Sequence, residues 1–309
     1  MQKGIVIEFL VKEYVIIDLE TKEKHYAQIK GKLRHCFVKK NKNKISEKIE
    51  EIKIGDIVLY EKKNDTFLID AITPRFNSLK RPNIANINQV LLVFSLKKPK
   101  FQFKLLDKFL LILNKYKIKV NLIFSKIDLI NEEEFKIFQK KISYYEKFYD
   151  IHFVDSKNKT GLENLFNIFK SKVTILAGQT GVGKSTLINA ITSLNLRTQE
   201  VSKGSNRGKH TTKNSKLYFF NEGYIADTPG FTKLNLSDIN FNEVKNFYND
   251  FVFFSTKCFF GFNCLHLNEK NCKIKEVCQK GLIPKIRYKN YLSLLKEIEN
   301  KNFKRKKRN

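Results

Sequence analysis

A glycine-rich segment, Gly178-Gln179-Thr180-Gly181-Val182-Gly183-Lys184-Ser185-Thr186, carries the most specific chemistry in this chain. Its spacing is G-x4-G-K-S; it follows the apolar run Val173–Ala177 and leads into the apolar residues Leu187–Ala190. A strand, a glycine loop and a helix in this order predict a phosphate-binding loop, because glycines let successive N–H groups point inward. We expect Lys184 to reach the β- and γ-phosphates and the Ser185 hydroxyl to ligate Mg²⁺. An ordinary glycine-rich turn is the alternative.

Two segments earlier in the chain have side chains suited to reading a guanine base. Ser125-Lys126-Ile127-Asp128 is similar to the N/T-K-x-D signature of GTPases. The Asp128 carboxylate accepts two hydrogen bonds, and guanine offers a ring N–H and an amine where adenine lacks such a pair. Lys126 can lay its stem along the base. Asp155-Ser156-Lys157 is similar to the S-A-K loop, so Ser156 and Lys157 are candidate contacts to the guanine carbonyl. For Asp128 the alternative is an aspartate that only starts a helix.

The Mg²⁺ and γ-phosphate elements are expected after the glycine loop. Asp227-Thr228-Pro229-Gly230 ends an apolar run and matches the D-x-x-G element. There Asp227 would hold Mg²⁺ through water and the Gly230 amide would sense the γ-phosphate. Either Thr211 or Thr212, in the polar loop before it, is the expected second Mg²⁺ ligand.

Phe231 stands where many GTPases place a glutamine that orients the attacking water. A phenyl ring cannot do this, so we expect slow intrinsic hydrolysis and a polar group supplied from elsewhere. His210, beside the switch threonines, is the candidate catalytic residue in this chain. A surface histidine without a catalytic role is the alternative.

The order of these elements differs from that of conventional GTPases. Those run from phosphate loop through switch threonine and D-x-x-G to N-K-x-D and S-A-K, whereas here the two base-reading segments come first. The order predicts a circularly permuted domain, which is tolerable when the original termini lie close together. Because D-x-x-G is then followed directly by the C-terminal region, nucleotide state could be passed to that region.

Four cysteines crowd into the C-terminal region, while Cys36 stands apart. Cys258-x5-Cys264-x-His266-x5-Cys272 supplies three thiolates and one imidazole, a set suited to a structural, four-coordinate Zn²⁺. In a reducing compartment such crowding indicates metal rather than disulfides. Cys278 is surplus to the set and is expected on a helix. Unligated cysteines in a core are the alternative.

The elements that must position these residues fall into three regions. Residues 1–72 have five short strand-like runs, which predict a small barrel of the OB type, with an SH3-like barrel fitting nearly as well. Its lysine-rich loop at residues 39–48 is either an oligonucleotide contact or a solvated charge run. The linker 73–88 contains two prolines, and from Gln89 apolar runs alternate with amphipathic helices, which predicts a mostly parallel α/β sheet.

The expected α/β elements and the last helix are defined by the hydrophobic pattern. Strands are expected at Gln89–Ser95, Val120–Phe124, Ile151–Val154, Val173–Ala177 and Gly223–Ala226, and helices at Phe103–Tyr116, Glu132–Tyr145, Leu162–Phe169 and Ile283–Ile298. A basic tail at Lys301–Arg308 is expected to be solvated, although RNA contact would suit its charge.

Composition indicates a soluble protein with a polyanionic partner. The chain has 309 residues with 59 Lys+Arg against 31 Asp+Glu, a formal charge of +28. Such an excess attracts phosphate backbones, although a lysine-rich genome bias is the alternative explanation. No apolar run of about 18 residues and no signal-peptide pattern occurs, so we expect a cytoplasmic protein without membrane insertion.

Taken together, these motifs resemble the ribosome small-subunit-dependent GTPase family (RsgA) along essentially the whole chain. The likeness extends to Arg81–Asn86 before the first GTPase strand and to Arg287-Tyr288-x-x-Tyr291 near the end. It implies an OB barrel at 1–72, a linker at 73–88, a permuted GTPase domain at 89–236 and a mainly helical zinc domain at 237–309. The implied cofactors are GTP or GDP with Mg²⁺ and one structural Zn²⁺.

The resemblance also implies a role. Members assist late maturation of the small (30S) ribosomal subunit, bind 16S ribosomal RNA, hydrolyse GTP when stimulated by the subunit and help to release an assembly factor. A monomer is expected. Two departures stand out: five residues rather than four separate Cys258 from Cys264, and Ser125 replaces the commoner Asn or Thr. The family's G-R-H-T-T loop reads Gly208-Lys209-His210-Thr211-Thr212 here.

Two other classes fit the phosphate loop. A P-loop ATPase or metabolic kinase would prefer ATP to GTP in competition binding. An RNA-binding module with a structural nucleotide site would show no multiple-turnover phosphate release with ribosomal subunits.

Overall fold

The first five strands close into a barrel around an apolar core to which every strand contributes, with Val6, Ile16, Ala27, Val58 and Ile69 among its buried residues. They are β1 (Gln2–Phe9), β2 (Tyr14–Asp18), β3 (Lys24–Arg34), β4 (Ile57–Lys63) and β5 (Thr66–Ile72). Their order around the barrel is β1-β2-β3-β5-β4, with β3 and β5 parallel and β4 pairing back to β1. This insertion of β5 between β3 and β4 is the OB arrangement, so the OB prediction is confirmed over the SH3-like one.

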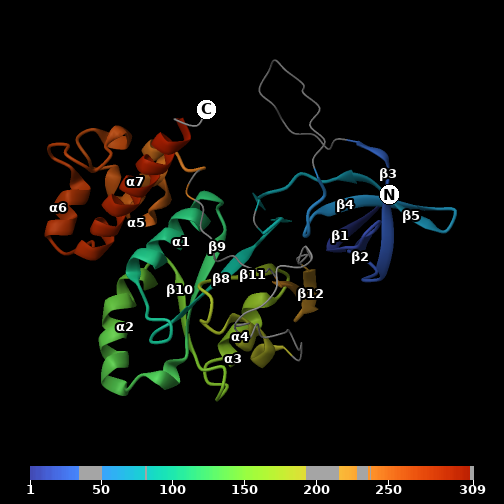
Figure 1. Ribbon diagram of the computed structural model, residues 1–309, viewed down its shortest axis with the longest axis horizontal. Helices are drawn as coiled ribbons and strands as arrows, with labels where there is room; N and C mark the ends of the chain where they lie inside the picture. The colour runs from blue at the N-terminus through green and yellow to red at the C-terminus, as the bar shows by residue number, and fades with distance from the viewer. Residues whose placement is uncertain (35–50, 81, 193–215, 228–235, 237, 307–309) are drawn as a thin grey trace. The chain divides into compact units, whose positions relative to one another are not determined.

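The computed structural model, shown in Figure 1, describes residues 1–34, 51–80, 82–192, 216–227, 236 and 238–306. The chain forms two compact units. Unit 1 comprises residues 1–91, 162–177 and 185–231, and unit 2 comprises residues 92–161, 178–184 and 232–309. The lysine-rich loop, Cys36 and His35 lie outside the described residues.

The central sheet has six strands in the order β10-β9-β8-β11-β13-β12. They are β8 (Gln89–Ser95), β9 (Lys119–Ser125), β10 (Asp150–Val154), β11 (Val173–Ala177), β12 (Lys216–Phe220) and β13 (Gly223–Asp227). β9 and β10 are parallel, as are β11 and β13, whereas β12 is antiparallel to β13. The mostly parallel α/β sheet is confirmed, and the edge strand β12 was not anticipated.

The predicted linker contains a small two-stranded sheet. Its strands are β6 (Ser78–Leu79) and β7 (Ile84–Ala85), paired antiparallel. Asn77 joins the two sides, since its amide donates to the carbonyl of Ile87 at 2.8 Å and its oxygen accepts from the Ile87 N–H at 2.9 Å. Pro74 therefore precedes this sheet, and Pro82 lies between its two strands.

Helices follow the strands of the central sheet. They are α1 (Phe103–Lys115), η1 (Ile127–Leu129), α2 (Glu132–Glu146), α3 (Glu163–Phe166), η2 (Asn167–Phe169) and α4 (Lys184–Ile191). Helix α2 begins at a capping box: the Asn131 side chain accepts from the Glu134 N–H at 2.8 Å, and the Glu134 carboxylate accepts from the Asn131 N–H at 3.2 Å. This cap satisfies two N–H groups that the helix itself leaves unpaired.

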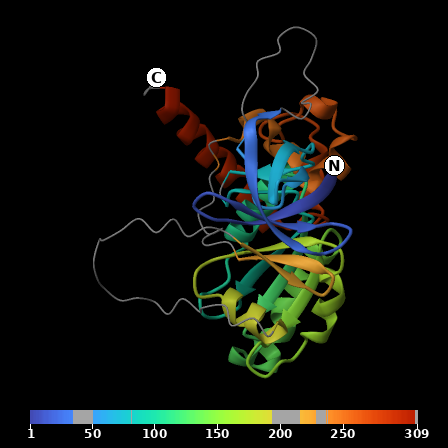
Figure 2. The same cartoon turned by 90° about the vertical axis from the view of Figure 1, so that its right-hand side faces the viewer.

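The C-terminal region is helical and belongs to unit 2. Its elements are η3 (Phe241–Phe247), α5 (Asn249–Ser255), η4 (Gly261–Asn263), α6 (Lys273–Gln279) and α7 (Lys285–Lys306). Figure 2 shows α7, in red, as one continuous helix. The prediction that this helix ends at Ile298 was wrong, because no glycine or proline interrupts the charged residues that follow and these are good helix formers. Much of the predicted basic tail is therefore helical.

One apolar core joins this region to helix α1. Leu111 and Ile112 of α1 pack with Val244, Phe251 and Tyr291, among other buried residues of the C-terminal elements. The core also includes the four C-terminal cysteines. Burying this apolar surface stabilises the C-terminal elements against α1.

Candidate functional site

The glycine-rich segment between β11 and α4 has the backbone of a phosphate loop. Gly178, Gly181 and Gly183 all have positive φ angles, of 137°, 81° and 94°. A Cβ at Gly178 would lie 2.1 Å from the carbonyl oxygen of Val93, so only glycine fits there. Helix α4 begins at Lys184, so the loop meets a helix N-terminus, where N–H groups attract anions.

Lys184 lies against its own loop. Its ammonium donates to the carbonyls of Gly178 and Gln179, at 2.9 and 2.7 Å. Burial lowers the pKa of Lys184 to about 8, because the charged amine loses hydration there. An anionic phosphate beside the ammonium would restore a favourable environment for the charge.

The Ser125 hydroxyl joins the end of β9 to the phosphate loop. Its Oγ lies 2.6 Å from the carbonyl oxygen of Val182 and 3.1 Å from that of Phe94. The hydroxyl has one proton, so it donates to one carbonyl at a time. Ser125 is buried, and the contact to Val182 keeps the start of the base-reading segment at a fixed distance from the phosphate loop.

Lys126 also contacts the phosphate loop. It has a left-handed backbone, with φ 57°, and its ammonium donates to the carbonyls of Gly181 at 2.6 Å and Lys98 at 2.8 Å. Its stem passes beside Gly183, whose added Cβ would lie 3.8 Å from the Lys126 Cε. Two consecutive residues of the base-reading segment thus bind carbonyls of the phosphate loop.

The expected base contacts follow two neighbouring strands. Val154 of β10 pairs with Ser125 of β9, so the segments after these strands begin side by side. Asp128 lies in η1 with an exposed side chain. Asp155 is buried and accepts from the N–H of Lys157 at 2.8 Å, which bends the Asp155-Ser156-Lys157 segment into a turn. Ser156 is half-buried and Lys157 exposed.

The remaining nucleotide-site candidates are described only in part. Asp227 is the last residue of β13. The parallel pair of Ile175 in β11 with Ala226 in β13 brings the strands before the phosphate loop and the D-x-x-G element together. Ser185 and Thr186 lie in the first turn of α4, and Thr180 is exposed in the loop. Outside the described residues lie His210, Thr211, Thr212, Gly230 and Phe231.

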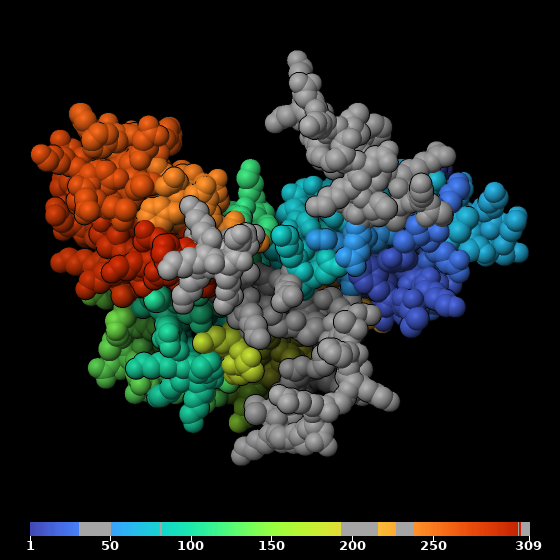
Figure 3. Space-filling view, turned by 45° about the horizontal axis from the view of Figure 1, so that its top comes forward, coloured from blue at the N-terminus to red at the C-terminus, as the bar shows by residue number. Residues whose placement is uncertain are grey.

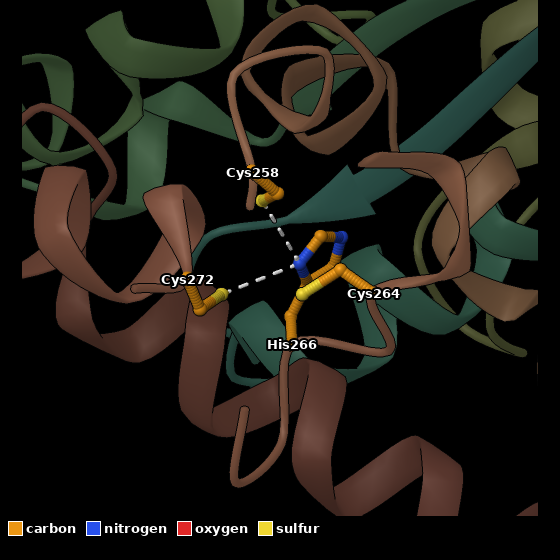
Figure 4. A group of neighbouring side chains, drawn as sticks. All are labelled: Cys258, Cys264, His266 and Cys272. Atoms are coloured by element: carbon orange, nitrogen blue, oxygen red, sulfur yellow. Dashed lines mark hydrogen bonds between the residues drawn. The ribbon is translucent and has the colours of Figure 1, made fainter. Parts of the chain in front are cut away.

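The predicted zinc ligands converge on one point, as Figure 4 shows. The ligand atoms of Cys258, Cys264, His266 and Cys272 all lie within 4.8 Å of one another, and the four residues are buried. The Nδ1 atom of His266 is 3.8 Å from the Cys258 sulfur and 3.4 Å from the Cys272 sulfur. A tetrahedral Zn²⁺ would separate such nitrogen and sulfur ligands by about 3.6 Å. The donor set and its spacing therefore fit Zn²⁺, with Cys258 included.

Burial sets the proton affinities of these ligands in the absence of an ion. It raises the pKa of Cys264 to about 12 and lowers that of His266 to about 4. Both shifts keep the groups neutral, because a buried charge without a counterion is costly. Cys278, on α6, is also buried but lies outside the four-residue group.

The tyrosines of the Arg287-Tyr288-x-x-Tyr291 motif support the metal loop. The Tyr288 hydroxyl donates to the carbonyl of His266, and the Tyr291 hydroxyl donates to that of Leu265, each at 2.7 Å. The Glu269 carboxylate accepts from the N–H of Leu265 at 2.6 Å. These contacts fix a backbone that at His266 is left-handed, with φ 59°.

Arg287 joins the C-terminal region to the helices that follow β8 and β9. Its guanidinium donates to Asp250 of α5 and to Asp107 of α1, and all three side chains are buried. The ring of Tyr248 lies under the guanidinium, 4.4 Å away. Tyr145 of α2 donates to Asp107 at 2.8 Å. Motif reasoning missed both aspartates, and the only available signal was an acidic residue on the apolar face of each helix.

A phosphate loop tied to a base-reading segment, on a sheet whose motifs run in permuted order, defines a circularly permuted P-loop GTPase with an N-terminal barrel and a C-terminal Cys₃His region. The model of the RsgA GTPase family matches residues 72–237. The chain belongs to the RsgA GTPase family, whose members are GTP-hydrolysing enzymes.

Relatives and solved structures agree with this assignment. The chain is 55% identical over 300 residues to the small ribosomal subunit biogenesis GTPase RsgA of Phytoplasma mali, covering 97% of each chain. It is 41% identical to the RsgA of Malacoplasma penetrans, covering 94% of this chain and 97% of the relative. The crystal structure of YjeQ from Thermotoga maritima superposes with a TM-score of 0.81 at 32% identity, covering 96% of this chain and 98% of that one. The crystal structure of YloQ, described as a circularly permuted GTPase, superposes with a TM-score of 0.78, also at 32% identity. The match covers 97% of this chain and 96% of YloQ.

Within the described residues, no helix is long and apolar enough to cross a membrane.

Proposed function

We propose that this chain is a GTPase that acts in late maturation of the small ribosomal subunit, binds 16S ribosomal RNA and hydrolyses GTP faster when the subunit is present. The names of its relatives support the partner, and the formal charge of +28 supports an RNA contact. Release of an assembly factor from the subunit is part of this proposal. The protein acts as a cytoplasmic monomer.

The observation that carries the nucleotide assignment is the double contact of Ser125 and Lys126 with the phosphate loop. It supports one site in which Asp128 reads the guanine while the loop from Gly178 to Thr186 holds the phosphates. The N–H groups of the loop and the Lys184 ammonium neutralise the phosphate charge. Ser156 and Lys157 lie after the neighbouring strand, where they can reach the carbonyl side of the base.

Ser185 and Asp227 would hold Mg²⁺, with either Thr211 or Thr212 as a further ligand. The ion supplies charge neutralisation at the β- and γ-phosphate oxygens. The Gly230 amide reports the presence of the γ-phosphate. His210 orients the attacking water, a role that Phe231 cannot fill.

Cys258, Cys264, His266 and Cys272 would hold one Zn²⁺. With four protein ligands the ion supplies a cross-link rather than a reactive centre. It would join the loop before η4 to the N-terminus of α6, where the N–H of Lys273 donates to the Cys258 sulfur at 3.3 Å.

The direct test is GTP hydrolysis at multiple turnover, with and without isolated small subunits, repeated at raised salt. We expect slow hydrolysis alone, strong stimulation by the subunits and a steep loss of stimulation with salt. Large ribosomal subunits are the matched control, since they present RNA without the specific site. Equal stimulation by both subunits would reject the assigned partner. Tighter binding of ATP than of GTP would reject the nucleotide.

A further inference from the structure

Apolar side chains are unusually exposed beside the metal cluster. Phe259, Phe262 and Phe253 are 75%, 71% and 70% exposed, and Phe260 and Val252 are exposed as well. We refer to these five residues as the phenylalanine surface. They lie on α5 and on the turn between Cys258 and Cys264. Figure 3 shows this part of the chain, in orange, at the molecular surface.

Three of these rings lie on a turn whose two ends are cysteines of the metal cluster. Cys258 and Cys264 are buried with their sulfurs in the cluster, and three backbone hydrogen bonds lie within the turn between them, one of them from the Asn263 N–H to the Phe260 carbonyl. The Gly261 N–H donates to the Cys258 carbonyl at 2.9 Å, and the Cys264 N–H donates to the Gly261 carbonyl at 3.2 Å. A turn pinned at both ends has no room to fold its phenylalanines into the core.

Two of the exposed rings pack against the ring of the next residue along the chain. Phe259 and Phe260 pack edge to face with centroids 5.0 Å apart, and Phe253 packs in the same way on Phe254, also at 5.0 Å. Such pairs restrict ring motion, so less entropy is lost when a flat partner stacks on them.

The charge around the rings is positive. Lys245 donates to the carbonyls of Phe262 and Cys264, which places its ammonium at the surface, and exposed Lys257 directly precedes Cys258. The neighbouring carboxylates are already engaged: Asp250 binds Arg287, and Glu269 binds the backbone of the metal loop.

A small cavity adjoins the rings. Its volume is about 210 Å³, and it is lined by Lys245, Asn246, Val252, Ser255, Gly261, Phe262, Cys264 and His266. The Nε2 atom of His266 is buried and has no hydrogen-bond partner among the described residues. Its other nitrogen, Nδ1, faces the cysteines. The cavity therefore places polar groups beside a stacking face.

We propose that the phenylalanine surface stacks on unpaired bases of single-stranded RNA. Exposed aromatic rings interleaved with lysines suit flat bases joined by a charged backbone. A protein groove would bury the rings equally well but would gain nothing from the flanking lysines unless it were acidic. This inference deepens the proposed function, because it assigns a base-stacking contact to the RNA partner.

A single tryptophan can report the contact directly. The chain has no tryptophan, so Phe262→Trp introduces one residue that can be excited selectively. Titration of this variant, as the full chain, with a single-stranded RNA dodecamer should quench the emission, and a duplex of the same sequence should not. Phe219→Trp is the matched control, because Phe219 is 63% exposed on β12 and does not belong to the phenylalanine surface. Emission from the Phe262→Trp variant that stays constant as single-stranded RNA is added overturns the proposal.

Two double variants test whether binding needs the aromatic rings themselves or only an apolar surface. Phe259→Tyr with Phe262→Tyr keeps both rings, whereas Phe259→Leu with Phe262→Leu keeps apolar surface but removes the stacking face. We expect the tyrosine pair to bind small subunits like the natural chain and the leucine pair to bind at least about tenfold more weakly. If the leucine pair binds small subunits as tightly as the natural chain, apolar surface is enough for the contact, and the base-stacking proposal is wrong.

The two proposals fail separately. If the tryptophan emission is not quenched but the small subunit still stimulates GTP hydrolysis, only the proposed base-stacking contact is rejected. If single-stranded RNA quenches the emission but the small subunit does not stimulate GTP hydrolysis, the proposed function is rejected and the RNA-binding surface stands.

Discussion

The guanidinium of Arg287 donates from Nε and Nη2 to the two carboxylate oxygens of Asp250, each at 3.0 Å. The remaining donor of the fork binds Asp107, which also accepts from Asn290 at 2.6 Å. One buried guanidinium therefore pairs with buried carboxylates from both α5 and α1. A planar fork suits this arrangement better than a lysine ammonium would.

Removing Arg287 should be costly. Arg287→Met leaves two buried carboxylates without a counterion, so we expect a loss of about 3–5 kcal/mol in the free energy of unfolding, measured with urea. The matched control is Lys119→Met, which breaks an exposed ion pair with Asp150 and should cost less than about 1 kcal/mol. Equal losses for the two variants would contradict this reading.

The loss in free energy of unfolding caused by Arg287→Met should depend on pH. Burial raises the pKa of Asp107, and removing the guanidinium takes away the charge that opposes this shift. A carboxyl whose pKa is higher in the folded state than in the unfolded state destabilises the protein at high pH, and this penalty shrinks as protons bind. As the pH falls from neutral toward the range where carboxyls titrate, the variant should thus recover more stability than the natural chain does, because the pKa of its Asp107 is raised further.

Binding of GTP should weaken above pH 8. The free protein holds the pKa of Lys184 at about 8, and phosphate favours the charged amine. Below pH 8 the amine is already protonated, so the affinity for GTP does not change with pH. Above pH 8 the protein must take up a proton when GTP binds, so the affinity falls by up to about tenfold per pH unit. Titration with a fluorescent GTP analogue from pH 7 to 9.5 measures this. Equal dissociation constants at pH 7.5 and 9.5 would exclude the coupling.

Asp128→Asn should exchange guanine for xanthine specificity. The amide donates where the carboxylate accepted, so it meets the exocyclic oxygen of xanthine but repels the guanine amine. We expect GTP to bind about 100-fold more weakly and XTP to bind better than GTP, as measured by competition. Glu132→Gln, a nearby exposed change from carboxylate to amide, serves as control and should leave the preference for GTP intact.

Zinc content should separate two cysteines of equal burial. Cys258 and Cys278 are each 7% exposed, but only Cys258 belongs to the ligand group. Cys258→Ser should lose most of the bound zinc and lower the urea midpoint, because a structural ion contributes directly to folding. Cys278→Ser should retain one zinc per chain. Metal analysis of the purified variants tests both, and full zinc content in Cys258→Ser would remove it from the site.

Local sequence pattern predicted much of the fold. The barrel strands and the helices α1 and α2 follow hydrophobic periods that need no distant partner to be recognised. Strand β12 was missed because its residues, Lys216–Phe220, become a strand only by pairing with β13 across a turn at Asn221 and Glu222. Both turn residues have positive φ angles, of 45° and 57°, yet the pair lacks the usual glycine.

The chemistry of the site divides in the same way. Spacing alone predicted the phosphate loop, the base-reading segment and the Cys₃His set, because each is a short motif whose residue types indicate its chemistry. Only tertiary structure decided that Ser125 and Lys126 bind the phosphate loop and that Cys258 reaches the metal cluster despite its longer gap. It also decided that one arginine joins α1 to α5. Such contacts depend on the distance between residues that are far apart in the chain, and that distance is set by packing, which no short sequence pattern records.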